Sequence, residues 1–192
     1  TKENLFHDKH GAHSLSTLAL QFIAGVLSIA RESAAFFNPT VNSYKRLVKG
    51  YEAPIFCAWG ARNRTALIRI PQATGSRSVR AELRSGDLMA NPYTTFYILL
   101  AAGMDGIKNN YRIAPEATTN LYHMTDEQRI AAGIEQLPST MDEALAALSA
   151  SEKMRSMLGT SAVDSFLQEK QHELNSFKTA VTDWELRQYI NA

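Results

Sequence analysis

Most side chains in this sequence that could do chemistry lie in one arginine-rich stretch, residues 38 to 84. A guanidinium presents a rigid fork of donors that matches carboxylate and phosphate oxygens, whereas a lysine ammonium is a mobile point charge. The cations are Arg46, Arg62, Arg64, Arg69, Arg77, Arg80, Arg84, Lys45 and Lys49, and the carboxylates are Glu52 and Glu82. Nine cations minus two carboxylates give +7, although the whole chain carries only +1. The stretch therefore predicts a site for a strongly anionic ligand.

The segment 80–84 is the most informative part of this stretch. The period of two in a β-strand places Arg80, Glu82 and Arg84 on one face. Such a row could be a surface ion-pair ladder, which usually contributes little to stability. Arg69 favours a functional site, because it interrupts an apolar run on the neighbouring strand and a cation there needs an anionic partner. Glu82 could then hold a divalent metal, since Mg²⁺ is typically bound by one or two carboxylates together with substrate phosphates.

The elements that must position these residues predict an α+β fold in a single domain. We expect a small antiparallel sheet of about three strands, flanked by helices and followed by a helical C-terminal tail. The loop 38–54 is too long for a simple connection and is a functional candidate. The predicted helices are 14–37, 91–108 and several short ones from residue 125 onward, and the predicted strands are 55–59, 65–70 and 78–84.

The composition excludes several classes of protein. With 45% hydrophobic and 20% charged residues, the 192-residue chain is typical of a globular domain. The apolar stretch 15–37 contains Gln21, Arg31 and Glu32, so it does not predict a membrane span. A single cysteine, Cys57, fits a reducing cytosol. A nucleic-acid-binding module remains as an alternative, but it would favour lysine-rich patches with interleaved exposed aromatics over arginines within strands.

Several linked motifs resemble the signatures of glutamine synthetases. They are the segments 38–47, 50–54, 61–71, 79–84, 90–93 and 101–107, in that order. The ending, residues 120–189, is similar to the shorter bacterial form of the type I enzymes. The resemblance covers essentially the whole chain and implies that residues 1–192 are the C-terminal portion of a catalytic domain. A β-grasp domain and the first part of the catalytic domain would precede Thr1.

The resemblance implies the following roles for the arginines. Arg46 and Arg84 would hold the carboxylates of glutamate. Arg64 and Arg69 would stabilise the phosphoryl group as it leaves ATP for the γ-carboxylate. Arg64, Arg77 and Arg80 would contact the nucleotide.

The two glutamates of the stretch also receive roles by resemblance. Glu82 would bind one of the Mg²⁺ or Mn²⁺ ions. Glu52 would lie on a loop that closes over the γ-glutamyl phosphate and would help to draw a proton from ammonium. The other metal ligands would precede Thr1, so these 192 residues alone are expected to be inactive.

The implied activity is the ATP-dependent ligation of ammonia to the γ-carboxylate of glutamate, with ADP and phosphate released. The full-length protein is expected to be a cytoplasmic, ring-forming homo-oligomer of two stacked hexamers. It would bind ATP, glutamate and ammonia, but neither nucleic acid nor a membrane.

Departures from the family pattern leave the amine substrate open. Lys49 replaces a usual proline, the segment 85–89 replaces a proline-containing stretch, and Trp59, Gly60 and Thr65 stand where serine variants are commoner. The last three choices resemble relatives that ligate glutamate to other amines, so a γ-glutamyl-amine ligase of the polyamine type is the alternative.

Two other features of the sequence favour structural readings. His7, His10 and His13 have a spacing of three, but no carboxylate cluster follows them, so a surface loop is preferred to a metal site. Tyr122 resembles the position that some relatives modify, but the residues around it are typical of the unmodified form.

Overall fold

The computed structural model describes residues 3–51 and 53–190, and its order of elements is that of an α+β fold, as the sequence predicts. The strands are β1 (Phe56–Ala61), β2 (Ala66–Ile70) and β3 (Glu82–Leu83). The α-helices are α1 (Thr17–Leu27), α2 (Ala34–Phe37), α3 (Ser43–Arg46), α4 (Pro92–Lys108), α5 (Asp126–Ala131), α6 (Met141–Ser149), α7 (Glu152–Leu158), α8 (Thr160–Thr179) and α9 (Asp183–Tyr189). Short 3-10 helices are η1 (Ala12–Ser14), η2 (Ser76–Ser78) and η3 (Leu121–His123).

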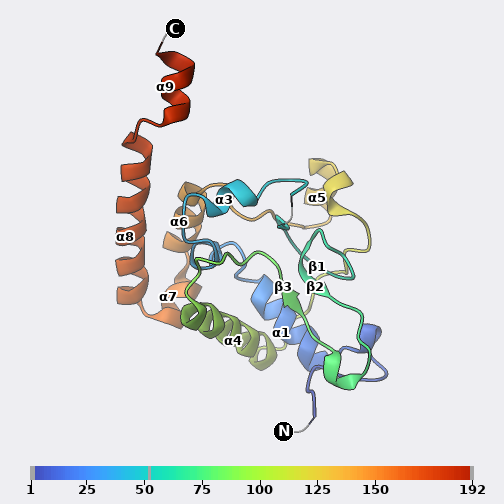
Figure 1. Ribbon diagram of the computed structural model, residues 1–192. Helices are drawn as coiled ribbons and strands as arrows, with labels where there is room; N and C mark the ends of the chain where they lie inside the picture. The colour runs from blue at the N-terminus through green and yellow to red at the C-terminus, as the bar shows by residue number, and fades with distance from the viewer. Residues whose placement is uncertain (1–2, 52, 191–192) are drawn as a thin grey trace.

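The sheet has the order β1-β2-β3 and is mixed (Figure 1). β2 and β3 pair antiparallel, as predicted, but β1 and β2 run parallel, with Gly60 opposite Arg69. The expectation of a purely antiparallel sheet was therefore wrong at this pair. A short connection normally forms a hairpin. Here the connection turns at Arg62, which has a φ of 55°. The side-chain amide of Asn63 then donates hydrogen bonds to carbonyls of the distant segment 117–119.

Helices α1 and α4 pack closely against each other because glycines line their contact. A Cβ on Gly25 would lie 2.1 Å from the carbonyl oxygen of Ala102, and one on Gly106 would lie 2.2 Å from that of Gln21. Only residues without a side chain allow the two backbones to approach so closely. Ile23 of α1 and Leu99 of α4 line an apolar pocket together with Ile68 and Leu83 of the sheet.

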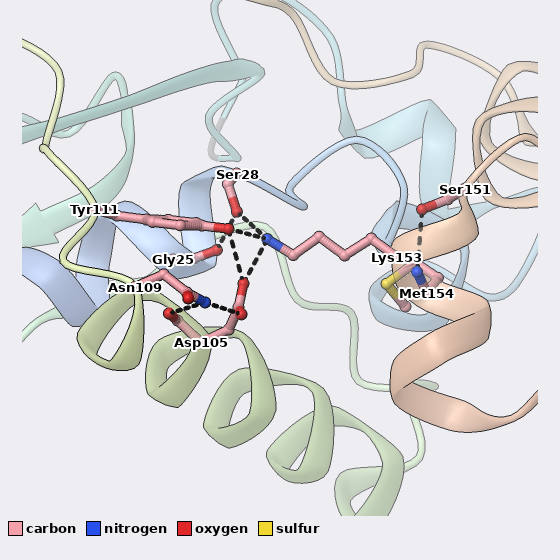
Figure 2. Close-up of polar contacts among 8 residues, drawn as sticks. All are labelled: Gly25, Ser28, Asp105, Asn109, Tyr111, Ser151, Lys153 and Met154. Atoms are coloured by element: carbon pink, nitrogen blue, oxygen red, sulfur yellow. Dashed lines mark hydrogen bonds and ion pairs between the residues drawn. The ribbon is translucent and has the colours of Figure 1, made fainter.

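The predicted helix 14–37 is interrupted, whereas the predicted helix 91–108 is present as α4. α1 begins at Thr17, where the Ser16 side chain caps it, and ends at Leu27. The hydroxyl of Ser28 donates to the carbonyl of Gly25 at 2.8 Å and also contacts Lys153 of α7 at 2.9 Å. A polar cluster therefore holds the end of α1 against α4 and α7 (Figure 2).

The helical C-terminal tail is present from α5 to α9. α8 packs against α6 and α7, and Figure 1 shows α9 projecting beyond the body of the chain. Phe166 of α8 stacks on Phe36 of α2 with ring centroids 4.1 Å apart, which attaches the tail to the core. Within the described ranges, none of the helices combines the length and apolarity needed to cross a membrane.

Candidate active site

The first part of the site is an ionic cluster on β2 and β3. Arg69 lies opposite Glu82 in the antiparallel pair. The carboxylate of Glu82 lies 2.9 Å from Nη2 of Arg80 and 3.6 Å from Nε of Arg69. Nε of Arg69 is buried and makes no hydrogen bond among the residues described. The cluster thus keeps unfilled donor capacity beside a single shared carboxylate.

The second part is an open pocket of about 410 Å³ lined by Gly50, Tyr51, Arg64, Thr65, Arg84 and Tyr122. Arg64 lies in the turn between β1 and β2 and Arg84 directly follows β3, yet a guanidinium nitrogen of Arg84 donates to the carbonyl of Arg64. The two arginines therefore share this pocket. Arg69, Arg80 and Glu82 do not line it and form the neighbouring cluster. The predicted strand 78–84 was too long, because β3 spans only Glu82–Leu83, so Arg80, Glu82 and Arg84 do not share one strand.

Arg46 reaches the same end of β3 from another element. It ends α3, and its Nη2 donates to the carbonyl of Ser85 at 2.5 Å and to the side-chain oxygen of Asn38 at 3.2 Å. Since Ser85 follows Arg84 in the sequence, the side chain of Arg46 reaches the residue next to the other arginine assigned to glutamate.

Two of the expected site residues are not brought into the site in this way. Arg77 is exposed on η2 and has no hydrogen bond or ion pair within the described part of the chain. Glu52 lies outside the described residues, although its neighbour Tyr51 lines the pocket.

Asn63 is an organising residue that sequence reasoning missed. Its amide nitrogen donates to the carbonyls of Ala117 at 2.7 Å and Thr119 at 2.9 Å. Its oxygen accepts from the backbone and the hydroxyl of Thr65, and the Thr65 hydroxyl accepts from the amide of Leu121 at 3.0 Å. One asparagine thus fixes the distant segment 117–121 beside the turn that bears Arg64. Its position between two arginines is the only signal that the sequence offers.

Tyr122 was assigned no role from the sequence, but it forms one wall of the pocket. Its hydroxyl lies 3.3 Å from the carbonyl oxygen of Ala53 and 3.4 Å from that of Tyr51. Burial raises the pKa of this hydroxyl, and the charge of Arg84 opposes that rise. Tyr122 therefore stays protonated and can donate near neutral pH.

The donor set does not form a complete metal site. Among the described residues there is no group of three or more His, Cys, Asp or Glu side chains that could hold an ion. Glu82 already contacts two of the arginines, Arg69 and Arg80. It fits as one ligand of a site shared with other residues and not as a site by itself.

Three of the departures from the family pattern have structural partners. The indole nitrogen of Trp59 donates to the carbonyl of Ala114 at 2.8 Å. A Cβ on Gly60 would lie 2.5 Å from the carbonyl oxygen of Ala117. Trp59 and Gly60 thus serve the packing of the segment 114–117, and among the three only Thr65 reaches the pocket.

Comparison with known proteins agrees with this geometry. Residues 1–189 match the family described as the glutamine synthetase catalytic domain. Glutamine synthetases from Clostridium saccharobutylicum and Staphylococcus aureus are 44% and 45% identical over 189 residues, which are 98% of this chain and 42% of each relative.

Solved structures give the same answer. A structure titled "GmaS/ADP complex-Conformation 1" has a TM-score of 0.82 at 35% identity and covers 99% of this chain and 43% of that one. One titled "Apo GmaS without ligand" has a TM-score of 0.79 at 34% identity, with coverage of 99% and 42%. The chain spans about two fifths of the length of these relatives. By sequence and by fold, the chain belongs to the glutamine synthetase family.

Proposed function

We propose that this chain supplies the C-terminal part of the active site of a glutamate–ammonia ligase. The reaction consumes ATP, glutamate and ammonia and forms glutamine, ADP and phosphate through γ-glutamyl phosphate. The observation that supports it most is the meeting of Arg64 and Arg84 in one pocket beside the Arg69–Glu82–Arg80 cluster, in a chain of this family.

The arginines match the needs of phosphoryl transfer, which depends on positioning and on neutralising charge at the phosphoryl oxygens. Arg64 and Arg69 would face the transferred group, because both are cations next to a pocket or cluster with spare donors. Arg46 and Arg84 would hold the carboxylates of glutamate. Arg64, Arg77 and Arg80 would contact ATP, and the likeness to an ADP complex supports a nucleotide site.

The metal and proton-transfer roles complete the proposal. Glu82 would contribute one oxygen ligand to Mg²⁺ or Mn²⁺, and the bound ion would offset negative charge on the phosphates. Glu52 would accept a proton from ammonium before attack on the acyl phosphate. Because the described residues supply only one metal carboxylate, these 192 residues alone are expected to lack ligase activity.

A γ-glutamyl-amine ligase is the second candidate. Thr65, which stands where serine is commoner, lines the pocket, and this choice resembles relatives that ligate glutamate to other amines. The packing roles of Trp59 and Gly60 weaken the argument, because a structural demand already explains those two residues. Ammonia therefore remains the preferred substrate.

The test uses the longer protein that contains this chain, supplied with ATP, glutamate and Mg²⁺, and either ammonia or a panel of alkylamines and polyamines. The proposal expects ammonia to give the highest kcat/KM, with one ADP released per glutamine. A higher kcat/KM with an amine would establish the second candidate. Failure to form any γ-glutamyl product, with ATP binding intact, would reject both.

The cellular setting is part of the proposal. A cytoplasmic location is supported by the single cysteine, which cannot form an internal disulfide. A ring of subunits in two stacked hexamers is expected from the family. Sedimentation of the longer protein would test it, since a monomer or dimer at working concentration would contradict the ring.

A further inference from the structure

A second pocket, of about 270 Å³, opens where β1 and β2 end. Its polar side chains are His13, Ser14, Arg62 and Gln72, and its apolar side includes Ile70 and Pro71. It shares no lining residue with the pocket of Arg64 and Arg84. The function proposed above does not use it.

Backbone strain is concentrated around this second pocket. In the described ranges, four residues other than glycine have a positive φ, and three of them line it: His13 at 54°, Ser14 at 60° and Arg62 at 55°. The fourth is Asn110; asparagine and histidine tolerate this conformation better than serine and arginine do. Left-handed backbone at other residue types is costly and tends to persist at ligand-binding sites. Glycine at these positions would relieve the strain, so the presence of larger residues there suggests that their side chains have a function.

The histidine is held in a fixed orientation. Its Nε2 lies 2.7 Å from Oε2 of Glu116, and Oε1 of Glu116 accepts from the backbone amide of Ala61 at 2.8 Å. The His13 ring also meets Trp59 edge-on, with centroids 6.4 Å apart. Although burial raises the pKa of Glu116, the Ala61 amide and His13 hold it below its ordinary value overall. Both oxygens of the Glu116 carboxylate thus already have partners.

The remaining polar capacity of the pocket consists mainly of donors. Arg62 is exposed, and its guanidinium makes no hydrogen bond or ion pair with any residue that the structure describes. The same holds, within those ranges, for the hydroxyl of Ser14 and the side-chain amide of Gln72. A guanidinium offers five donors and no acceptor, and its fork fits carboxylate or phosphate oxygens.

From these observations we propose that the pocket of His13, Ser14, Arg62 and Gln72 binds the oxyanion group of a small molecule, either a carboxylate or a phosphate. Arg62 supplies the charge and the forked hydrogen bonds. Ser14 and Gln72 supply further hydrogen bonds, and Ile70 and Pro71 contact the body of the ligand. The volume suits a ligand of amino-acid size, because drug-sized molecules occupy pockets of about 300–1,000 Å³.

The experiment measures binding of inorganic phosphate and, separately, of acetate to the intact protein by isothermal titration calorimetry. We compare the wild type with Arg62→Gln and with a matched control, Arg112→Gln. Arg112 is exposed and lies outside both pockets. We expect Arg62→Gln to weaken one binding event per chain at least tenfold, and Arg112→Gln to leave it unchanged.

The anion whose binding is weakened in Arg62→Gln identifies the ligand group, and weakened binding of both anions assigns the site to oxyanions in general. Equal binding of both anions by wild type and Arg62→Gln would overturn the proposal.

A second variant, Arg62→Gly, separates a binding role from a structural one. Glycine adopts a φ of 55° without strain. The melting temperature should therefore rise by on the order of 2–4 °C, while the binding event is lost. A lower melting temperature would show that Arg62 supports the fold, and retained binding would show that it is not the anion ligand. Either result would contradict the proposal.

Discussion

Lys153, at the start of α7, places its ammonium nitrogen 2.8 Å from Oδ2 of Asp105 on α4 (Figure 2). The same nitrogen lies 2.9 Å from the hydroxyl of Ser28 and 3.2 Å from that of Tyr111, whose ring centroid is 4.9 Å away. Asn109 donates to the other oxygen of Asp105 at 2.7 Å. One cation thus joins the end of α1, the end of α4 and the start of α7.

Replacing Lys153 with methionine should destabilise the chain at neutral pH. The methionine keeps the aliphatic stem but leaves Asp105 without its cation. Because the pair is partly exposed, the expected cost is about 1 kcal/mol, the upper end for such pairs. Urea unfolding at pH 7 measures it, with the more exposed pair Lys178–Asp142 as a control through Lys178→Met. An equal loss in both variants would deny the cluster a special role.

The pH dependence of this effect has a definite sign. The hydrogen bond from Lys153 is the main cause that lowers the pKa of Asp105 below 3.8. A carboxylate with a lowered pKa contributes stability above its ordinary pKa and loses it as the pH falls through the folded-state value. Burial acts against charge on Lys153, but Asp105 raises its pKa above 10.5 overall, so that contribution is lost only in strong alkali. The difference between wild type and Lys153→Met should therefore shrink below about pH 4.

Asn63→Ala should destabilise the turn that carries Arg64. The substitution removes two donors to the segment 117–119 and the acceptor for Thr65, so several polar groups lose their partners. The expected loss is about 1–3 kcal/mol in the free energy of unfolding. Asn175→Ala on α8 removes an exposed asparagine with one side-chain partner and should cost less than about 0.5 kcal/mol. Similar losses for both variants would show that Asn63 is not an organising residue.

How far the sequence predicts this fold depends on how many residues separate the contacting partners along the chain. The presence of β2 follows from its local apolar pattern, and α4 follows from the capping by Asn91 and Pro92. The parallel direction of β1 does not, because its turn is held by Asn63 contacts 54 and 56 residues away. The end of α1 is likewise set from a distance, by Lys153 acting on Ser28 across 125 residues.

The same limit applies to the candidate site. Arginine spacing predicts an anion site on β2 and β3, because strand alternation fixes which residues share a face. Tyr122 could not be placed there, since it reaches the pocket through the bond between Leu121 and Thr65, 56 residues apart. Local sequence patterns therefore identify the charged residues of the site, whereas hydrogen bonds between distant segments determine which other residues line the pocket.

Arg84→Lys in the longer protein should weaken glutamate binding. Lysine keeps the charge but loses the fork, and one guanidinium nitrogen of Arg84 already contacts the carbonyl of Arg64. A hydrogen bond to a charged group contributes about 1.5–3 kcal/mol, so the KM for glutamate should rise roughly ten- to hundred-fold. Arg112→Lys is the control. A fall in kcat with an unchanged KM would place Arg84 at the reacting group instead of at the substrate carboxylate.

Glu52→Ala in the longer protein should damage the two half-reactions unequally. Phosphoryl transfer relies mainly on arginines and metal, so γ-glutamyl phosphate should still form. Its capture requires ammonia, which Glu52 is proposed to generate from ammonium, and general-base catalysis typically contributes about a hundred- to ten-thousand-fold. Amide formation should therefore slow by a factor in that range, while the intermediate is lost to water.

The measured quantity is ADP released per glutamine formed, which should rise above one. Glu169→Ala, an exposed glutamate on α8, should leave the ratio at one. Coupled turnover near the normal rate in Glu52→Ala would remove Glu52 from the chemistry.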